Sequence, residues 1–214
     1  PLAAELMKRF SSPTDVGVIA TFIVMALAYF VFMMGGALGY RVPATGWKPA
    51  GWTPPPPAAN AMITPHHVHV KKVWGIPQFW LVWMVLCMNV SAGIGVIGMA
   101  SPMLQEVFGG NLIGVAKKFG ELDKTQLAGI AGVAAGFTAL LSLFNIGGRF
   151  VWASFSDKIG RKLTYATFFA LGITLYALSP WAAHSGSQGL FVAMMCVILS
   201  MYGGGFATVP AYLA

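Results

Sequence analysis

The stretch LLSLFNIGGRFVWASFSDKIGRK, residues 140–162, carries one arginine inside an apolar run and then ends in a charged turn. Arg149 is the only formally charged residue within any of the long apolar stretches. An arginine keeps its charge in proteins, and a charge buried in hydrocarbon is costly. We therefore expect Arg149 to face a water-filled path or a charged ligand. The alternative is a structural arginine that binds helix-end carbonyls or extends to the membrane surface.

The composition indicates a membrane protein. Of the 214 residues, 57% are hydrophobic and only 9% are charged, whereas soluble domains carry about 25% charged residues. Crossing a bilayer takes about 20 apolar residues, and five stretches are long enough. The sequence therefore predicts an all-α, polytopic membrane protein with five transmembrane helices. These are expected near residues 16–40, 77–100, 128–153, 163–180 and 189–209.

The charges between these stretches indicate an orientation. Two connecting segments, 41–76 and 154–162, together hold seven Lys or Arg residues and one Asp. The remaining connections and the N-terminal segment hold five basic and five acidic residues. Because cytoplasmic loops are enriched in Lys and Arg, we expect 41–76 and 154–162 to be cytoplasmic. The basic pI then reflects topology, and we expect no nucleic-acid partner because no basic face carries interleaved aromatic residues.

The segment RVPATGWKPAGWTPPPPAAN, residues 41–60, is rich in proline. Proline disfavours a continuous helix, so 41–76 is expected to be a linker between two membrane bundles. Trp47, Trp52 and Trp74 are expected at the level of the lipid headgroups, where tryptophan is enriched.

Polar residues of the third stretch recur every three or four positions. On a helix this spacing places them on one face, which is typical of a face that lines a cavity or packs on protein. Arg149 lies ~12 Å upstream of Asp157 on such a helix, near the middle of the bilayer. Asn145 shares its face, and Asn89 lies deep in the second stretch. The residues of the stripe are Thr138, Ser142, Asn145, Arg149, Trp152 and Ser156.

The last stretch contains YGGGFATVP, residues 202–210. Three glycines before a proline weaken a helix, and interrupted helices often form transporter binding sites. Tyr202 is therefore a candidate to hydrogen-bond a substrate, with simple aromatic packing as the alternative.

Three other patterns have no chemical role in this interpretation. GIGVIG, residues 93–98, matches a dinucleotide fingerprint, but it lies inside an apolar stretch, and close helix packing explains its glycines better. The same packing pattern fits Gly132 with Gly136, and Gly35 with Gly39. HHVH, residues 66–69, lacks the spacing of a metal site. We expect no metal, no cofactor and no catalytic group.

The segment GRFVWASFSDKIGRK, residues 148–162, resembles the loop signature of major facilitator superfamily transporters. Within that superfamily, further stretches are similar to the oxalate/formate antiporter family. They are YRVPATGWKPAGW (40–52), NVSAGIGVIGMASPMLQEVFG (89–109) and YGGGFATVPAYLA (202–214).

The resemblance implies a domain organisation. The five helices would be the sixth to tenth of twelve in a partial major-facilitator-type bundle. Residues 1–40 would end the N-terminal bundle, 41–76 would link the bundles, and 77–214 would supply four helices of the C-terminal bundle. The chain begins at Pro1 and stops at Ala214 directly after an apolar run, so we expect the rest of the transporter chain as its partner.

The resemblance also implies roles for single residues. Arg149 matches an arginine that holds the dicarboxylate, together with a lysine of the eleventh helix, and Tyr202 is the nearest candidate for an aromatic wall. A cytoplasmic gate contact is implied for the loop, where Ala153 replaces a frequent glycine. The matching loop residues are Asp157, Gly160, Arg161 and Lys162.

The expected function is secondary transport of small organic anions, in particular carboxylates, by oxalate/formate-type exchange. The substrate-binding candidates are Arg149, Asn145, Tyr202 and Asn89. The expected location is the bilayer of the bacterial inner membrane. Two alternatives stay open, which are proton-coupled monocarboxylate symport in the same fold and a membrane subunit that transports nothing.

Overall fold

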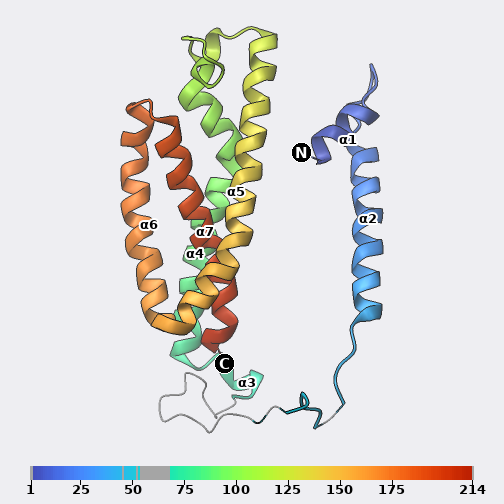
Figure 1. Cartoon of the computed structure of the whole chain (residues 1–214), viewed down its shortest axis with the longest axis vertical. Helices are drawn as coiled ribbons and strands as arrows, with labels where there is room; N and C mark the ends of the chain where they lie inside the picture. The colour runs from blue at the N-terminus through green and yellow to red at the C-terminus, as the bar shows by residue number, and fades with distance from the viewer. Residues whose placement is uncertain (1, 45, 52, 54–67, 214) are drawn as a thin grey trace. The chain divides into compact units, whose positions relative to one another are not determined.

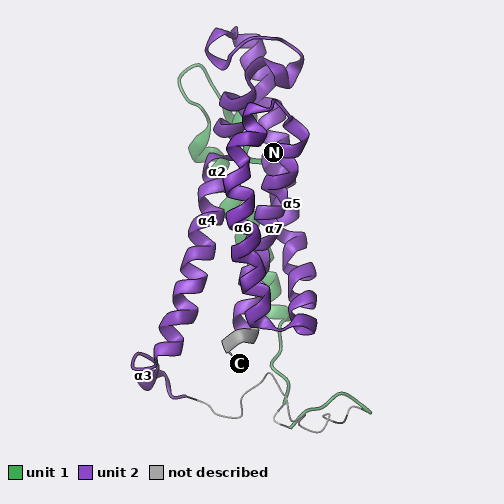
Figure 2. Ribbon diagram, turned by 90° about the vertical axis from the view of Figure 1, so that its left-hand side faces the viewer, with its two compact units in different colours: residues 1–59 green, residues 60–214 purple. Residues whose placement is uncertain are grey.

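The described part of the computed structural model is mainly helical (Figure 1). Its described residues include five helices that are long and apolar enough to cross a membrane, which confirms the predicted fold class. It divides into two compact units, residues 1–59 and 60–214, coloured separately in Figure 2. The structure describes residues 2–44, 46–51, 53 and 68–213.

The first unit is a short helix followed by one long apolar helix. Helix α1 spans Leu2–Phe10 and helix α2 spans Val18–Gly39. Gly17 between them has a φ of 76°, and a side chain there would collide with the Phe10 backbone. Because only glycine adopts this conformation easily, α2 begins at Val18 and not at the predicted residue 16. Within α2 only Thr21 is buried, so nearly the whole apolar surface of this helix is open within its own unit.

The second unit contains the other four long helices. In Figure 1, α4 to α7 lie side by side and run alternately up and down. The start of α4 and the α5–α6 turn lie at one end of this unit, and the α4–α5 and α6–α7 connections lie at the other. This alternation is the one that the charges predict, while the cytoplasmic assignment of either end stays a prediction. The helices are α3 (Val70–Val73), α4 (Pro77–Phe108), α5 (Lys124–Ile159), α6 (Arg161–His184) and α7 (Gln188–Leu213), with 3₁₀ turns at Gly109–Ile113 and Phe119–Glu121.

Helix α4 is longer than predicted. It continues past Pro102 to Phe108, into the segment 101–127 that was expected to be a loop. Leu104 and Phe108 are 2% and 4% exposed, and the burial of these apolar side chains stabilises the helix beyond the proline.

Helix α5 is also longer at both ends. Its first turn is closed by a capping box, in which the Asp123 carboxylate accepts from the Gln126 N–H (2.8 Å) and the Gln126 side chain accepts from the Asp123 N–H (3.2 Å). At the other end, α5 continues to Ile159, so the predicted turn 154–162 is helical apart from Gly160. Gly160 has a φ of 88°, which ends one helix and lets the next begin at once.

Helices α5 and α7 form the tightest contact of the second unit. A methyl group built at Gly148 would overlap the backbone of Ser200, and one at Gly203 would overlap the backbone of Asn145. Gly204 lies in the same way against the Trp152 side chain. The glycines therefore allow the two backbones to approach more closely than any larger residue would.

The predicted glycine contacts are only partly found. Gly93 lies on the ring of Tyr202, so this member of the GIGVIG stretch packs on a neighbouring helix, as expected. A methyl group at Gly132 or Gly136 would meet nothing in the described second unit, so close packing is not found at this predicted pair. Gly35 and Gly39 lie in the first unit, and their packing stays a prediction.

Candidate functional site

Arg149 lies on the face of α5 that neighbours α7. Its guanidinium carbon is 5.9 Å from the centroid of the Phe206 ring, within the range of a cation–π interaction. In the described part of the chain, no carboxylate pairs with Arg149 and no carbonyl accepts a hydrogen bond from it. The side chain is exposed within this unit. The alternative role, in which Arg149 binds helix-end carbonyls, therefore finds no such carbonyl among the described residues.

Phe206 connects Arg149 to Tyr202. The two rings meet edge to face with their centroids 5.2 Å apart, and the Tyr202 ring in turn covers Gly93 of α4. Arg149, Phe206 and Tyr202 therefore form one continuous surface, which we call the cation–aromatic face. Phe206 was not predicted from the sequence. Its spacing of four residues from Tyr202 was the available signal, because residues at i and i+4 share a helix face.

The two asparagines lie against the backbone of α7. The Asn89 side chain is buried, and its Nδ2 donates to the Tyr202 carbonyl at 3.4 Å. Asn145 is half-buried beside Gly203, and its Oδ1 has no hydrogen-bond partner among the described residues. Both amides therefore flank the glycine-rich segment of α7, whereas Arg149 and Tyr202 are joined through Phe206.

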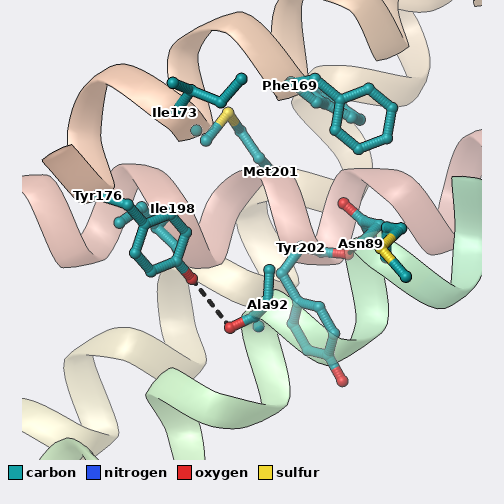
Figure 3. A pocket seen from close by; sticks show the side chains of 12 residues that line it. Asn89, Ala92, Phe169, Ile173, Tyr176, Ile198, Met201 and Tyr202 are labelled. Atoms are coloured by element: carbon teal, nitrogen blue, oxygen red, sulfur yellow. Dashed lines mark hydrogen bonds between the residues drawn. The ribbon is translucent and has the colours of Figure 1, made fainter.

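A largely apolar cavity of about 270 Å³ lies between α4, α6 and α7 (Figure 3). Asn89 and Tyr202 line it, and Arg149 does not. The Tyr176 hydroxyl of α6 donates to the Ala92 carbonyl of α4 at 2.9 Å, the contact drawn as a dashed line. The structure therefore separates this apolar cavity from the positive charge.

The turn between α5 and α6 holds an ion pair. Nη1 of Arg161 lies 2.6 Å from the Asp157 carboxylate and donates to the Ser156 hydroxyl at 2.8 Å. The Arg161 side chain is 14% exposed and Asp157 is 66% exposed. The Gly160 N–H donates to the Ser156 carbonyl at 3.0 Å, which fixes the turn. Lys162 is exposed and takes no part in this pair.

The chain matches one family model and one known antiporter. The family model of the Major Facilitator Superfamily matches residues 2–214. The chain belongs to the Major Facilitator Superfamily. Over 150 residues it is 29% identical to the oxalate:formate antiporter of Oxalobacter formigenes, which is 70% of this chain but only 31% of the antiporter. No solved structure is significantly similar to the chain.

Membership confirms the superfamily resemblance and the multi-pass membrane character of the protein.

Helix α7 of this superfamily member is continuous, and the predicted interruption at its glycines is absent. The Tyr165 hydroxyl of α6 donates to the Gly205 carbonyl at 2.7 Å, and the Thr208 hydroxyl bonds the Tyr165 oxygen at 3.1 Å. Thr208 also lies 3.1 Å from the Gly204 carbonyl. These buried hydroxyls hold the carbonyls of the weak segment, so the helix passes through it intact.

The histidine segment is described only in part. His66 and His67 lie outside the described residues, and His69 caps α3 by accepting from the Lys71 N–H at 3.3 Å. Trp52 also lies outside the described residues.

Proposed function

We propose that this chain is part of a secondary transporter that binds small carboxylates at Arg149 and exchanges them across a bacterial inner membrane. The observation that carries the proposal is a guanidinium with no carboxylate partner in the described chain, placed beside the Phe206 ring, which in turn packs on Tyr202. The likeness to a bacterial oxalate:formate antiporter supports both the substrate class and the membrane. The proposal keeps the domain organisation predicted from the sequence. Residues 1–40 contain helix six, 41–76 form the linker, and 77–214 contain helices seven to ten.

The guanidinium supplies the attraction for the substrate. Its planar fork of N–H donors matches the two oxygens of a carboxylate, and such charge-assisted pairs are stronger than neutral hydrogen bonds. The Phe206 ring provides a flat wall beside this fork, Tyr202 packs against that ring, and neither offers an anion of its own. Substrate-binding roles for Asn145 and Asn89 belong to the same proposal. Asn89 also holds the α7 backbone through the Tyr202 carbonyl, whereas the Asn145 Oδ1 has no partner among the described residues.

The positive charge also provides a reason for exchange. Closing the site around a bare Arg149 would place an unpaired charge in a low-dielectric medium, which is costly. A bound carboxylate neutralises the charge and makes the closed state accessible, so the loaded carrier reorients faster than the empty one. The substrate is carried as the two bundles rock about a site near the midplane.

The turn between α5 and α6 is proposed as the cytoplasmic gate contact. Asp157 and Arg161 are paired across one helical turn, with Gly160 as the pivot and Lys162 beside them. Because Asp157 is largely exposed, it is free to change partner when the bundles move.

The test is carboxylate uptake into proteoliposomes by the full-length transporter that carries these residues. Arg149→Gln should reduce oxalate uptake by about 100-fold or more, because removing one partner of a desolvated charge pair costs several kcal/mol. Arg9→Gln, an arginine of α1 outside the second unit, is the matched control and should retain uptake. Unchanged uptake by Arg149→Gln would refute the assignment. Uptake driven by a pH gradient without any internal carboxylate would replace exchange by proton symport.

A further inference from the structure

A second apolar groove lies at the end of the unit that holds the α5–α6 turn. It runs between the first turns of α4 and of α6 and has a volume of about 250 Å³. Its only charged lining residue in the described chain is Lys162. The rest of the groove is formed by Leu81, Val82, Val85, Tyr165, Ala166 and Phe169. The groove is therefore an apolar slot with a single cation at one end.

The tryptophans at the start of α4 indicate how deep this groove lies in the bilayer. Trp74, Phe79, Trp80 and Trp83 form a chain of ring contacts with centroids 5.5 to 6.1 Å apart. The Trp80 Nε1 donates to the Trp74 carbonyl at 3.0 Å, and the three tryptophans are exposed. Exposed tryptophans at the end of a spanning helix belong to the headgroup level of a bilayer. The groove starts beside this aromatic cluster, so its mouth lies at the headgroups and its length lies in the hydrocarbon.

The mouth of the groove carries positive charge that nothing in the described chain neutralises. Asp157 forms an ion pair with Arg161, and no carboxylate of the described chain pairs with the exposed Lys162. The first turn of α6 contains no acidic residue, although the N-terminus of a helix favours negative charge. Lys162 and the helix end therefore both attract an anion at the same place.

The dimensions suit a lipid chain. From Lys162 to Phe169 the groove follows α6 for ~10 Å at 1.5 Å per residue. The side chains along this length are apolar apart from Tyr165, whose hydroxyl is bonded to the Gly205 carbonyl. A soluble anion would use the cation and leave this apolar length uncovered, whereas a lipid uses both.

We propose that this groove binds one anionic phospholipid, with its phosphate at Lys162 and one acyl chain between α4 and α6. Helices α4 and α6 meet directly at few points, so the lipid chain would fill the space between them at this end. The site is separate from the cation–aromatic face, and its occupancy does not depend on transport of any carboxylate.

The test is native mass spectrometry of the purified full-length protein with phosphatidylglycerol and with phosphatidylcholine of the same acyl chains. Phosphatidylglycerol should be retained preferentially. Lys162→Ala should lower this preference about fivefold, the effect of one lysine on an anionic lipid surface. Lys158→Ala is the matched control, because Lys158 is an exposed cation of the same turn that does not line the groove, and it should keep the preference.

A second pair of variants tests the acyl chain. Ala166→Leu fills the groove without changing any charge and should reduce retention of phosphatidylglycerol, whereas Ala170→Leu enlarges an exposed α6 residue outside the groove and should not. Equal losses with Lys158→Ala and Lys162→Ala, equal retention of the two lipids, or full retention by Ala166→Leu would each overturn the proposal.

Discussion

Arg149 and Arg161 lie twelve positions apart, Arg149 within α5 and Arg161 at the start of α6, and their surroundings differ completely. Arg161 has a carboxylate at 2.6 Å and a hydroxyl at 2.8 Å, both from residues of its own turn. Arg149 has an aromatic ring at 5.9 Å and no carboxylate within the described residues. Nη1 of Arg161 is thus paired within its own chain, although its Nε has no hydrogen-bond partner among the described residues, whereas no carboxylate there pairs with Arg149.

Under the proposed function, this difference separates a structural charge, Arg161, from a substrate-binding charge, Arg149. An ion pair formed within one turn reports on the local fold, because both partners are supplied together. An arginine in an apolar helix without such a partner carries a desolvation cost that a ligand can remove. The two arginines therefore predict different responses to mutation.

The largest effect is expected where α7 supports the Arg149 site. Gly148→Leu would drive a side chain into the Ser200 backbone and force α5 away from α7. Overpacking of this kind costs about 1–3 kcal/mol or more, which corresponds to a fall in Tm of roughly 5 °C for a chain of this size. Transport should be lost as well, because separating α5 from α7 would displace the whole α7 side of the Arg149 site and not only Phe206.

Gly147→Leu is the control for this prediction, since a side chain at Gly147 meets nothing in the described chain. Thermal unfolding in detergent measures both variants. Equal Tm values for the two variants would show that the α5–α7 contact does not hold the site together.

A smaller effect is expected at the paired arginine. Arg161→Gln and Asp157→Asn should each slow transport by less than Arg149→Gln, and the double variant should be little worse than either single one. Because Asp157 is largely exposed, we expect a coupling energy of only about 0.5–1 kcal/mol. Uptake rates of the four proteins give this coupling, and strictly additive losses would mean that the pair does not act as a unit.

The smallest effect is expected at Phe206. Phe206→Leu keeps an apolar side chain but removes the ring beside Arg149, so the apparent affinity for carboxylate should fall about threefold to fivefold, as expected for a cation–π contact of about 0.5–1 kcal/mol. Phe206→Tyr retains the ring and should bind normally. Competition by unlabelled substrate measures both, and a normal affinity for Phe206→Leu would remove the ring from the site.

The elements of this protein were largely predictable, whereas their contacts were not. Hydropathy alone located all five long helices, because lipid demands an apolar segment of fixed length. The extension of α4 to Phe108 could not be predicted from hydropathy, because it depends on burial against other helices. The Asp123 capping box, by contrast, is a local signal, because Asp123 and Gln126 are only three residues apart in the sequence.

The candidate site shows the same division. Arg149 could be singled out from sequence because a charge in an apolar run is rare. Its neighbour Phe206 comes from another helix, and only the register set by Gly148 and Gly203 brings α7 close enough. Likewise the predicted break in α7 is absent because Tyr165, 40 residues away, bonds the carbonyl of Gly205.

The central claim is that the charge of Arg149 attracts the substrate, and chemical restoration of that charge tests it most directly. Arg149→Cys would be prepared in a full-length protein whose native Cys87 and Cys196 are replaced by serine, and modified with either an ethylammonium or a neutral methyl thiosulfonate reagent. We predict that carboxylate exchange is lost in the unmodified variant, returns with the ethylammonium adduct and stays absent with the neutral adduct. Equal recovery with the neutral adduct, or normal exchange by the unmodified variant, would contradict the account.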